Sequence, residues 1–415
     1  MKTIMHNIRL NSIWIAAVTL VASLSSCGEE ELGPTIFPEG PDETETSYTY
    51  KFDHWLNESF RDIYNLDLKY KLADVEVNMQ YNLTPVTIDN AKSLSVLIKY
   101  LWFDAYAELT GKQFLQQYGP RIINLVGSPA YNPSSGTETL GLAEGGIKVS
   151  LFKVNEMNPA DIEMLNEFYF RTMHHEFGHI LHQTKSYPTE FNLLSSNFYD
   201  SSTWQLRNMA VTASMGFVTN YASSQPREDF AEVIANYVTR TDDQLDLIRW
   251  FASLGWASDS SGGYCSYYLY EDEEDRLAQK PTYIYRMFDR PAIARGTLVD
   301  GVPFDPVDKE GNELQSGRLY KVCVYDPTCR QYFSTLNSAL AHLDELKEKY
   351  GEVIAVPDTD GVNGADIIRQ KETIVRNWFK DIWHIDFDKL RKIVLRRQAD
   401  IDLQSLLNEI ENIQQ

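Results

Sequence analysis

The chain has 415 residues, of which 43% are hydrophobic and 12% aromatic, and its formal net charge is -21 at pH 7. A chain of this length can bury one large core or two medium ones, and these fractions exclude a disordered protein. The acidic balance argues against nucleic acid as a partner, because phosphates would repel such a surface.

The first 26 residues have the composition of a bacterial export signal. Lys2 and Arg9 form a charged start, and residues 13–22 form an apolar run too short to be a stop-transfer helix. Residues 24–27, Leu-Ser-Ser-Cys, resemble the lipobox of bacterial lipoproteins, where the signal is cut before an acylated cysteine. We therefore expect a lipoprotein signal peptide at 1–26 and a lipid anchor at Cys27. An ordinary secretory signal with an incidental cysteine is the alternative.

Residues 27–47 form an acidic tether with too few apolar side chains to fold. The run Glu29-Glu30-Glu31 behind the acylated cysteine resembles the surface-export signal of Bacteroidota lipoproteins. This resemblance implies an outer-membrane lipoprotein at the cell surface rather than at the periplasmic face. A plain solvated linker explains the same charges equally well.

Apolar periodicity predicts helices and strands alternating up to residue 157. A short helix is expected from about residue 52, and two further helices are expected at 89–109 and 111–118. The expected strands cover 66–72, 75–81, 121–127 and 147–155. A polar, glycine-rich loop is predicted between 128 and 145. A further helix is predicted from the cap at 158–159 to about 183. We expect the strand at 147–155 to lie beside a cleft and to pair with an extended substrate.

That last helix carries the sequence His-His-Glu-Phe-Gly-His at residues 174–179. Four-residue spacing places His175 and His179 on one helical face, where two imidazoles can bind one Zn²⁺. Glu176 lies between them and is the candidate general base. Chance alone can produce such a pentapeptide, so the remainder of the chain must supply a third ligand.

The third ligand is not expected among the nearest residues. Lys185 stands where metzincins have their third histidine, and the histidine motif has no neighbouring cysteine. His182 lies seven residues beyond His175, about 10 Å along the helix axis, which is too far for both to reach one ion. We therefore expect His182 to have a packing role or to contact a ligand from behind.

The helix predicted at 228–240 supplies the carboxylates. Glu228 and Glu232 are four residues apart and share a helical face, as in gluzincins, where the first acid binds zinc and the second orients a ligand histidine. Two solvated surface glutamates are the alternative, and the division of roles between the pair stays open. Tyr221 is the candidate donor to an oxyanion, with a buried core tyrosine as its alternative.

Two further helices are expected at 209–215 and 243–254, and residues 256–361 then change in character. Short strand-like runs, glycine-rich turns and one helix at 334–350 predict an inserted α+β module. Cys323 and Cys329 flank a turn there, so a disulfide between them is a candidate outside the cytoplasm. Helices at 365–383, 387–397 and 401–413 are expected to complete the core.

The candidate site resembles the catalytic set of the anthrax lethal factor class of gluzincins. There the tyrosine, the ligand glutamate and the following glutamate have the spacing of Tyr221, Glu228 and Glu232. More widely, the chain resembles the Bacteroidota substrate-import-associated zinc metallohydrolase lipoproteins, or zinc-binding metallopeptidases. This wider resemblance covers most of 27–255 and 362–400, and rests on the lipobox, Trp55 and residues 64–65, 125–128, 174–183, 216–221 and 367–397. It implies genes beside a TonB-dependent transporter and its substrate-binding lipoprotein, and it implies no particular substrate.

Together these features predict an α+β, zincin-like metallopeptidase fold. Its core covers 48–255, the inserted module 256–361 and the C-terminal helices 362–415. One Zn²⁺ would be bound by His175, His179 and Glu228, and the enzyme would hydrolyse peptide bonds in polypeptides. The alternatives are a non-catalytic binding lipoprotein of a TonB-dependent uptake system with a structural zinc, and a hydrolase acting on a non-peptide amide.

Overall fold

The computed structural model describes residues 47–72, 82–131, 138–139, 141–144, 148–253 and 363–413, with short segments between 257 and 355. The chain divides into two compact units, Met1–His54 with Gln415 and Trp55–Gln414, and the second carries the residues discussed below. Among the described residues, no helix is long and apolar enough to cross a membrane. Cys27 and the acidic run behind it lie outside the described residues.

Helical segments lie before and after the first strand. They are α2 (Tyr50–Leu56), the π-helical turn η1 (Asn57–Arg61), α3 (Asp62–Tyr64), α4 (Ile88–Ile98), the π-helical turn η3 (Lys99–Phe103), α5 (Asp104–Thr110) and α6 (Lys112–Tyr118). Thr87 caps α4 by accepting a hydrogen bond from the Asn90 backbone N–H. Gly111 separates α5 from α6 with a φ of 78°, a value that favours glycine. The helices predicted at 89–109 and 111–118 are confirmed.

A four-stranded sheet has the order β1-β2-β6-β5. Its strands are β1 (Asp67–Lys69), β2 (Ile122–Leu125), β6 (Lys148–Leu151) and β5 (Gly141–Glu144). The first three run parallel, with Leu68 paired to Ile123 and Ile123 paired to Val149, and β5 runs antiparallel to β6. A separate hairpin joins β3 (Ala130–Tyr131) to β4 (Glu138–Thr139). This small mixed sheet among helices confirms the predicted α+β class.

The prediction that the 147–155 strand pairs with a substrate is wrong, because that strand does not lie at an edge of the sheet. That strand is β6, and both of its sides are occupied, by β2 and by β5. One end of the sheet is β5, which lies in the segment predicted to be a loop, and the other end is β1. The glycines and polar residues of this segment gave no strand pattern. The strand β5 forms by pairing with β6 rather than through the β propensity of its own residues. The strand predicted at 75–81 lies outside the described residues.

The helix that carries the histidine motif begins later than predicted. Asp161 caps it by accepting a hydrogen bond from the Met164 backbone N–H at 3.0 Å. Asn158 instead accepts from the Ala160 backbone N–H at 3.1 Å and closes a turn before the helix. The continuous helical stretch consists of α7 (Ile162–Leu165), the π-helical turn η5 (Asn166–Phe170) and α8 (Arg171–Thr184). π-helical turns often occur next to functional sites.

Short helices and two longer ones follow α8. They are the 3₁₀ turns η6 (Thr189–Leu193), η7 (Trp204–Leu206) and η8 (Tyr221–Ser224), and the α-helices α9 (Met209–Ser214), α10 (Pro226–Thr239) and α11 (Asp242–Ala252). Another 3₁₀ turn, η4 (Val154–Glu156), precedes the motif helix. Pro226 at the first position of α10 fits its missing backbone N–H. The helix that bears the two glutamates is therefore confirmed, with its start two residues earlier than predicted.

An antiparallel sheet occupies the segment predicted to be an inserted module. Its order is β13-β12-β9-β8-β14, with β7 also paired to β8. The elements here are β7 (Ala257–Asp259), β8 (Gly262–Leu269), α12 (Glu273–Leu277), β9 (Tyr283–Arg290), β10 (Leu298–Val299), β11 (Val302–Pro303), β12 (Leu319–Val324), β13 (Gln331–Phe333) and β14 (Val353–Ala355). Cys323 lies in β12, whereas Cys329 lies outside the described residues, as does most of the helix predicted at 334–350. The disulfide and the division into domains stay predictions.

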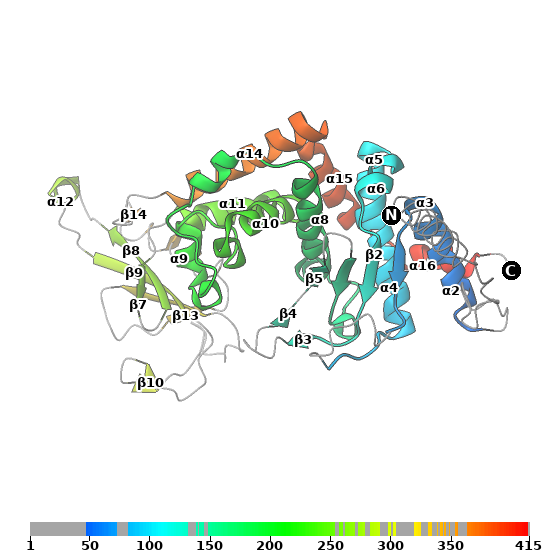
Figure 1. Ribbon diagram of the computed structural model, residues 1–415. Helices are drawn as coiled ribbons and strands as arrows, with labels where there is room; N and C mark the ends of the chain where they lie inside the picture. Colours follow the sequence, from blue (N-terminus) through cyan, green and yellow to red (C-terminus); the bar gives the residue numbers. More distant parts are fainter. Residues whose placement is uncertain are drawn as a thin grey trace, which may run out of the picture. The chain divides into compact units, whose positions relative to one another are not determined.

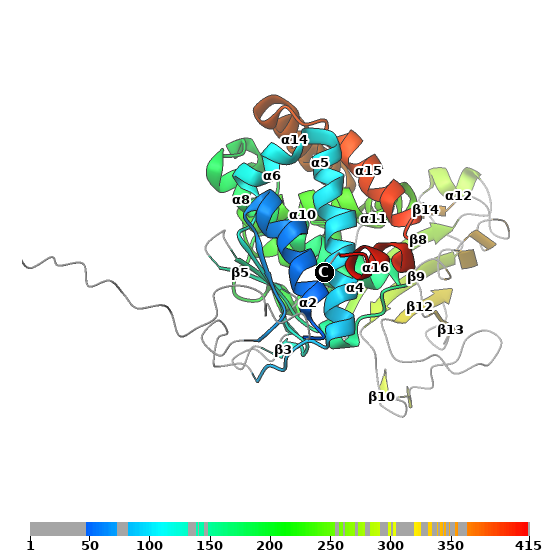
Figure 2. The same ribbon diagram turned by 90° about the vertical axis from the view of Figure 1, so that its right-hand side faces the viewer.

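The C-terminal helices lie against α10 and α4 (Figures 1 and 2). They are α14 (Gly364–Trp383), α15 (Phe387–Ala399) and α16 (Leu403–Glu411). From α15, Arg391 donates to the carbonyl oxygens of Tyr237 and Arg240 at the C-terminal end of α10, where carbonyl groups lack intrahelical partners. From α16, Glu411 pairs with Lys92 of α4 at 3.2 Å. The last segment of the chain thus holds the glutamate-bearing helix in place.

Candidate metal centre

The helix α8 packs against an aromatic core on one side and against α10 on another. Phe177 lies edge-on to Trp102 and Tyr106, with ring centroids 5.0 and 5.1 Å away, and all three side chains are buried. Gly178 approaches α10 so closely that a Cβ atom would lie 3.2 Å from Cδ1 of Ile234. The aromatic core and the small glycine therefore set how α8 and α10 lie against each other.

Three side chains converge between these two helices. Oε2 of Glu228 lies 2.9 Å from Nε2 of His179 and 3.2 Å from Nε2 of His175. The two Nε2 atoms are 3.1 Å apart, and the three candidate ligand atoms all lie within 4.8 Å of one another. Two imidazoles and one carboxylate are a ligand set of catalytic zinc sites. The structure thus brings together the three residues predicted to bind zinc.

The opposite nitrogen of each imidazole has its own partner. Nδ1 of His175 lies 2.7 Å from Oε1 of Glu232, and Nδ1 of His179 lies 2.8 Å from Nε2 of His182. Because a carboxylate only accepts, Nδ1 of a neutral His175 carries the proton and its Nε2 offers a lone pair. That lone pair and the oxygen of Glu228 then face one point, where they repel each other unless a cation lies between them. The side chains therefore fit a zinc ion.

The electrostatics of the cluster also favour a cation. Burial alone would lower the pKa of His175, but its hydrogen bonds to Glu228 and Glu232 raise that pKa to about 10. Burial would likewise raise the pKa of Glu232, but His175 and Thr219 hold it below its ordinary value. Surroundings that stabilise a proton on a buried imidazole stabilise a metal ion at the same place.

The two predicted catalytic side chains lie at this cluster. Glu176 is partly buried, and burial raises the pKa of its carboxyl group. Tyr221 is 38% exposed, so it is not a core tyrosine, and its ring centroid lies 5.7 Å from that of His175. Burial of the hydroxyl and its hydrogen bond to the Glu228 carboxylate raise the pKa of Tyr221. Glu232 contacts His175 from behind, which is the position predicted for the second glutamate.

The chain is similar to known proteins in sequence and in structure. Residues 45–259, just over half of the chain, match a family described as putative zinc-binding metallo-peptidases. The chain belongs to this family. A crystal structure of a putative zinc-binding metallo-peptidase from Bacteroides caccae is similar at 28% sequence identity and a TM-score of 0.53. The match covers 89% of this chain and 98% of that one. No curated protein matches the chain.

Two polar contacts at this candidate metal centre carry no distinctive signal in the sequence. Oγ1 of Thr219 donates to Oε2 of Glu232 at 2.5 Å. Nε2 of Gln225 donates to Oε1 of Glu228 at 3.1 Å. Each contact uses the carboxylate oxygen that points away from the histidines, so both carboxylates are held in orientation at their second oxygen.

A fully buried ion pair secures the start of α10. Nζ of Lys371 lies 2.6 Å from Oδ2 of Asp229, and both side chains are 0% exposed. Lys371 also donates to the carbonyl oxygen of Gly216 at 2.8 Å, and Tyr199 donates to Asp229 at 2.7 Å. Because Asp229 directly follows Glu228, the pair ties α14 to the helical turn that carries the candidate ligand.

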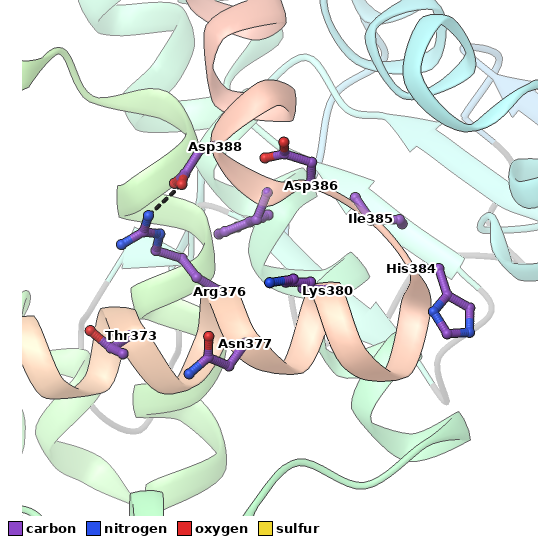
Figure 3. A pocket seen from close by; sticks show the side chains of 9 residues that line it. Thr373, Arg376, Asn377, Lys380, His384, Ile385, Asp386 and Asp388 are labelled. Atoms are coloured by element: carbon purple, nitrogen blue, oxygen red, sulfur yellow. Dashed lines mark hydrogen bonds and ion pairs between the residues drawn. The ribbon is translucent and has the colours of Figure 1, made fainter.

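A hollow of about 600 Å³ opens where α14 meets α15 (Figure 3). It is lined by Thr373, Arg376, Asn377, Lys380, His384, Ile385, Asp386, Phe387 and Asp388. Arg376 is paired with Asp388 there, and Asp386 caps α15 by accepting from the Lys389 backbone N–H. No candidate zinc ligand lines this hollow, so its size does not make it the site of the chemistry.

Proposed function

We propose that the protein is a zinc-dependent peptidase of the gluzincin type, which hydrolyses peptide bonds in polypeptides with one bound Zn²⁺. The observation that carries this proposal is the convergence of His175, His179 and Glu228 on one point. Glu176 lies on the same helix as the two histidines, where a general base is needed. Membership in a zinc-binding metallo-peptidase family supports the same chemistry.

The protein's own residues have distinct tasks in this mechanism. His175, His179 and Glu228 would hold the zinc ion, which when bound would polarise the scissile carbonyl group and make water more acidic. Glu176 accepts a proton from the attacking water and then donates it to the leaving amine. The burial that raises the pKa of Glu176 makes its carboxylate a stronger base than an exposed glutamate. Tyr221 donates its hydroxyl hydrogen to the oxygen on which negative charge develops.

Substitution Tyr221→Phe is expected to lower kcat by about 10²–10³-fold, the usual cost of losing one donor to an oxyanion. The ring contacts with Trp204, at 4.9 Å, and with His175 should survive, so KM and zinc content should change little. Steady-state kinetics on a cleaved peptide measure both constants. Tyr131→Phe, at a tyrosine that is 57% exposed, is the matched control. An unchanged kcat in Tyr221→Phe would exclude Tyr221 as the donor to the oxyanion.

We further propose that an extended substrate pairs with β5. In the sheet order, β5 is the last of four strands and is bonded to β6 on one side. The outer edge of such a strand offers backbone N–H and C=O groups to a peptide in extended conformation. This mode of binding suits a polypeptide and is poor for a small amide.

Tethering through Cys27 is part of the proposal. Acyl groups on this residue would hold the enzyme on the outer membrane, at the cell surface, beside a TonB-dependent transporter and its substrate-binding lipoprotein. The support is the lipobox-like sequence at residues 24–27 and the acidic run behind it. Stable anchoring by more than one acyl chain is consistent with membrane affinity that rises with each buried methylene.

Cleavage-site profiling of the purified protein with a peptide library tests the peptidase proposal. Defined cleavage sites are expected, and a zinc chelator should abolish them until zinc is restored. Bound zinc without any peptide cleavage would contradict the proposal and favour a binding lipoprotein with a structural zinc. Release of products only from non-peptide amides would contradict it in favour of a different hydrolase.

A further inference from the structure

His182 lies beside the candidate ligands on α8 and has no role in the proposed mechanism. It lies three residues beyond His179, so the two side chains are neighbours on the surface of α8. Nε2 of His182 lies 2.8 Å from Nδ1 of His179, with ring centroids 5.0 Å apart. The cluster of candidate ligand atoms does not include His182. His182 therefore contacts the candidate ligand His179 and is not itself in the group that could hold the metal ion.

We propose that His182 is a positioning residue, which fixes the orientation and the tautomer of His179 for zinc binding. The inference rests on the zinc site of the proposed function. A neutral imidazole that binds metal through Nε2 carries its proton on Nδ1. Nδ1 of His179 must then donate, and Nε2 of His182 must accept with its own proton on Nδ1. One hydrogen bond thus sets the tautomers of both rings.

The His182 ring is itself held by aromatic neighbours. Tyr187 and Phe230 lie perpendicular to it, with ring centroids 5.4 and 6.2 Å away. These two rings stack on each other at 4.2 Å, and Phe230 belongs to α10, the helix that carries Glu228. A ring packed edge-to-face on two fixed rings has little freedom to turn. The acceptor nitrogen is therefore preorganised toward His179.

A neutral acceptor suits this position better than a carboxylate would. The partner of His175 is a carboxylate, Glu232, and two more, Glu176 and Glu228, lie at the same cluster. A fourth carboxylate at this cluster would add further like-charge repulsion. An imidazole orients His179 without adding charge. The two ligand histidines are thus supported in chemically different ways.

Two substitutions of His182 separate positioning from packing. His182→Phe keeps an aromatic ring against Tyr187 and Phe230 but removes the acceptor nitrogen. His182→Gln loses the ring but places an amide oxygen near the position of the imidazole Nε2. Loss of a residue that supports a metal ligand typically weakens metal affinity about 10–100-fold. We expect that loss in His182→Phe and a dissociation constant close to that of the parent protein in His182→Gln.

The readout is the zinc dissociation constant of the full chain, from competition with a chromophoric chelator, with thermal unfolding of the zinc-free variants beside it. Equal affinities in all three proteins, or a larger loss in His182→Gln than in His182→Phe, would overturn the proposal. Affinity is measured without a substrate, so the result stands even if no peptide is cleaved.

A measurement on the unsubstituted protein covers the case in which a variant does not fold. In ¹⁵N-labelled, zinc-loaded protein, long-range ¹H–¹⁵N spectra report which ring nitrogen is protonated. We expect a proton on Nδ1 of His182 and none on its Nε2. A proton on Nε2 of His182 would overturn the assignment of this nitrogen as the acceptor.

Discussion

Substitution Glu176→Gln is expected to leave zinc bound and to lower kcat for peptide hydrolysis by about 10²–10⁴-fold, the usual contribution of a general acid–base group. Glutamine has nearly the same shape, but its amide oxygen cannot take a proton from water at neutral pH. Glu176 is not one of the three residues that converge on the metal point, so zinc content should not change. Steady-state kinetics and metal analysis on the same preparation measure both effects.

Glu190→Gln provides the matched control for this substitution. Glu190 is an exposed residue of η6, so the same chemical change there should alter neither kcat nor zinc content. Turnover at the parent rate in Glu176→Gln would exclude Glu176 as the base. Loss of zinc together with activity would instead show that this carboxylate helps to hold the metal.

The two candidate histidine ligands could be predicted because their relation is local. Residues four apart on a helix share a face, whatever surrounds that helix, and α8 spans both His175 and His179. The same rule placed Glu228 and Glu232 together on α10. That α8 packs beside α10 depends on contacts such as the close approach at Gly178, which no local pattern encodes. The resemblance to gluzincins supplied that step.

Contacts that depend on the tertiary structure could not be predicted from local sequence patterns. The edge strand β5 owes its conformation to β6, so its own residues resembled a loop. Lys371 and Asp229 are far apart in the sequence, and a lysine in a helix ordinarily indicates a solvated surface. The seven-residue separation of His182 from His175 argues against His182 as a ligand of the same ion. Its three-residue spacing from His179 could have indicated the hydrogen bond that the structure contains.

Parallel substitution of the two glutamates of α10 is expected to separate the roles that their spacing leaves open. Glu228→Gln removes the charged oxygen that lies near both Nε2 atoms, so zinc affinity should fall by more than about 100-fold, beyond the usual loss for a residue that only supports a ligand. Glu232→Gln keeps an amide oxygen that can accept from Nδ1 of His175, so a loss of about 10–100-fold or less is expected.

The order of the two losses is the decisive result, because both substitutions remove one negative charge from the same cluster. A general electrostatic contribution would weaken zinc binding to a similar extent in both variants. Direct ligation by Glu228 adds the loss of a metal–oxygen bond in only one of them. Chelator competition on the two proteins measures the difference. A larger loss in Glu232→Gln than in Glu228→Gln would exchange the roles of the two glutamates and would require α10 to present a different oxygen to the metal.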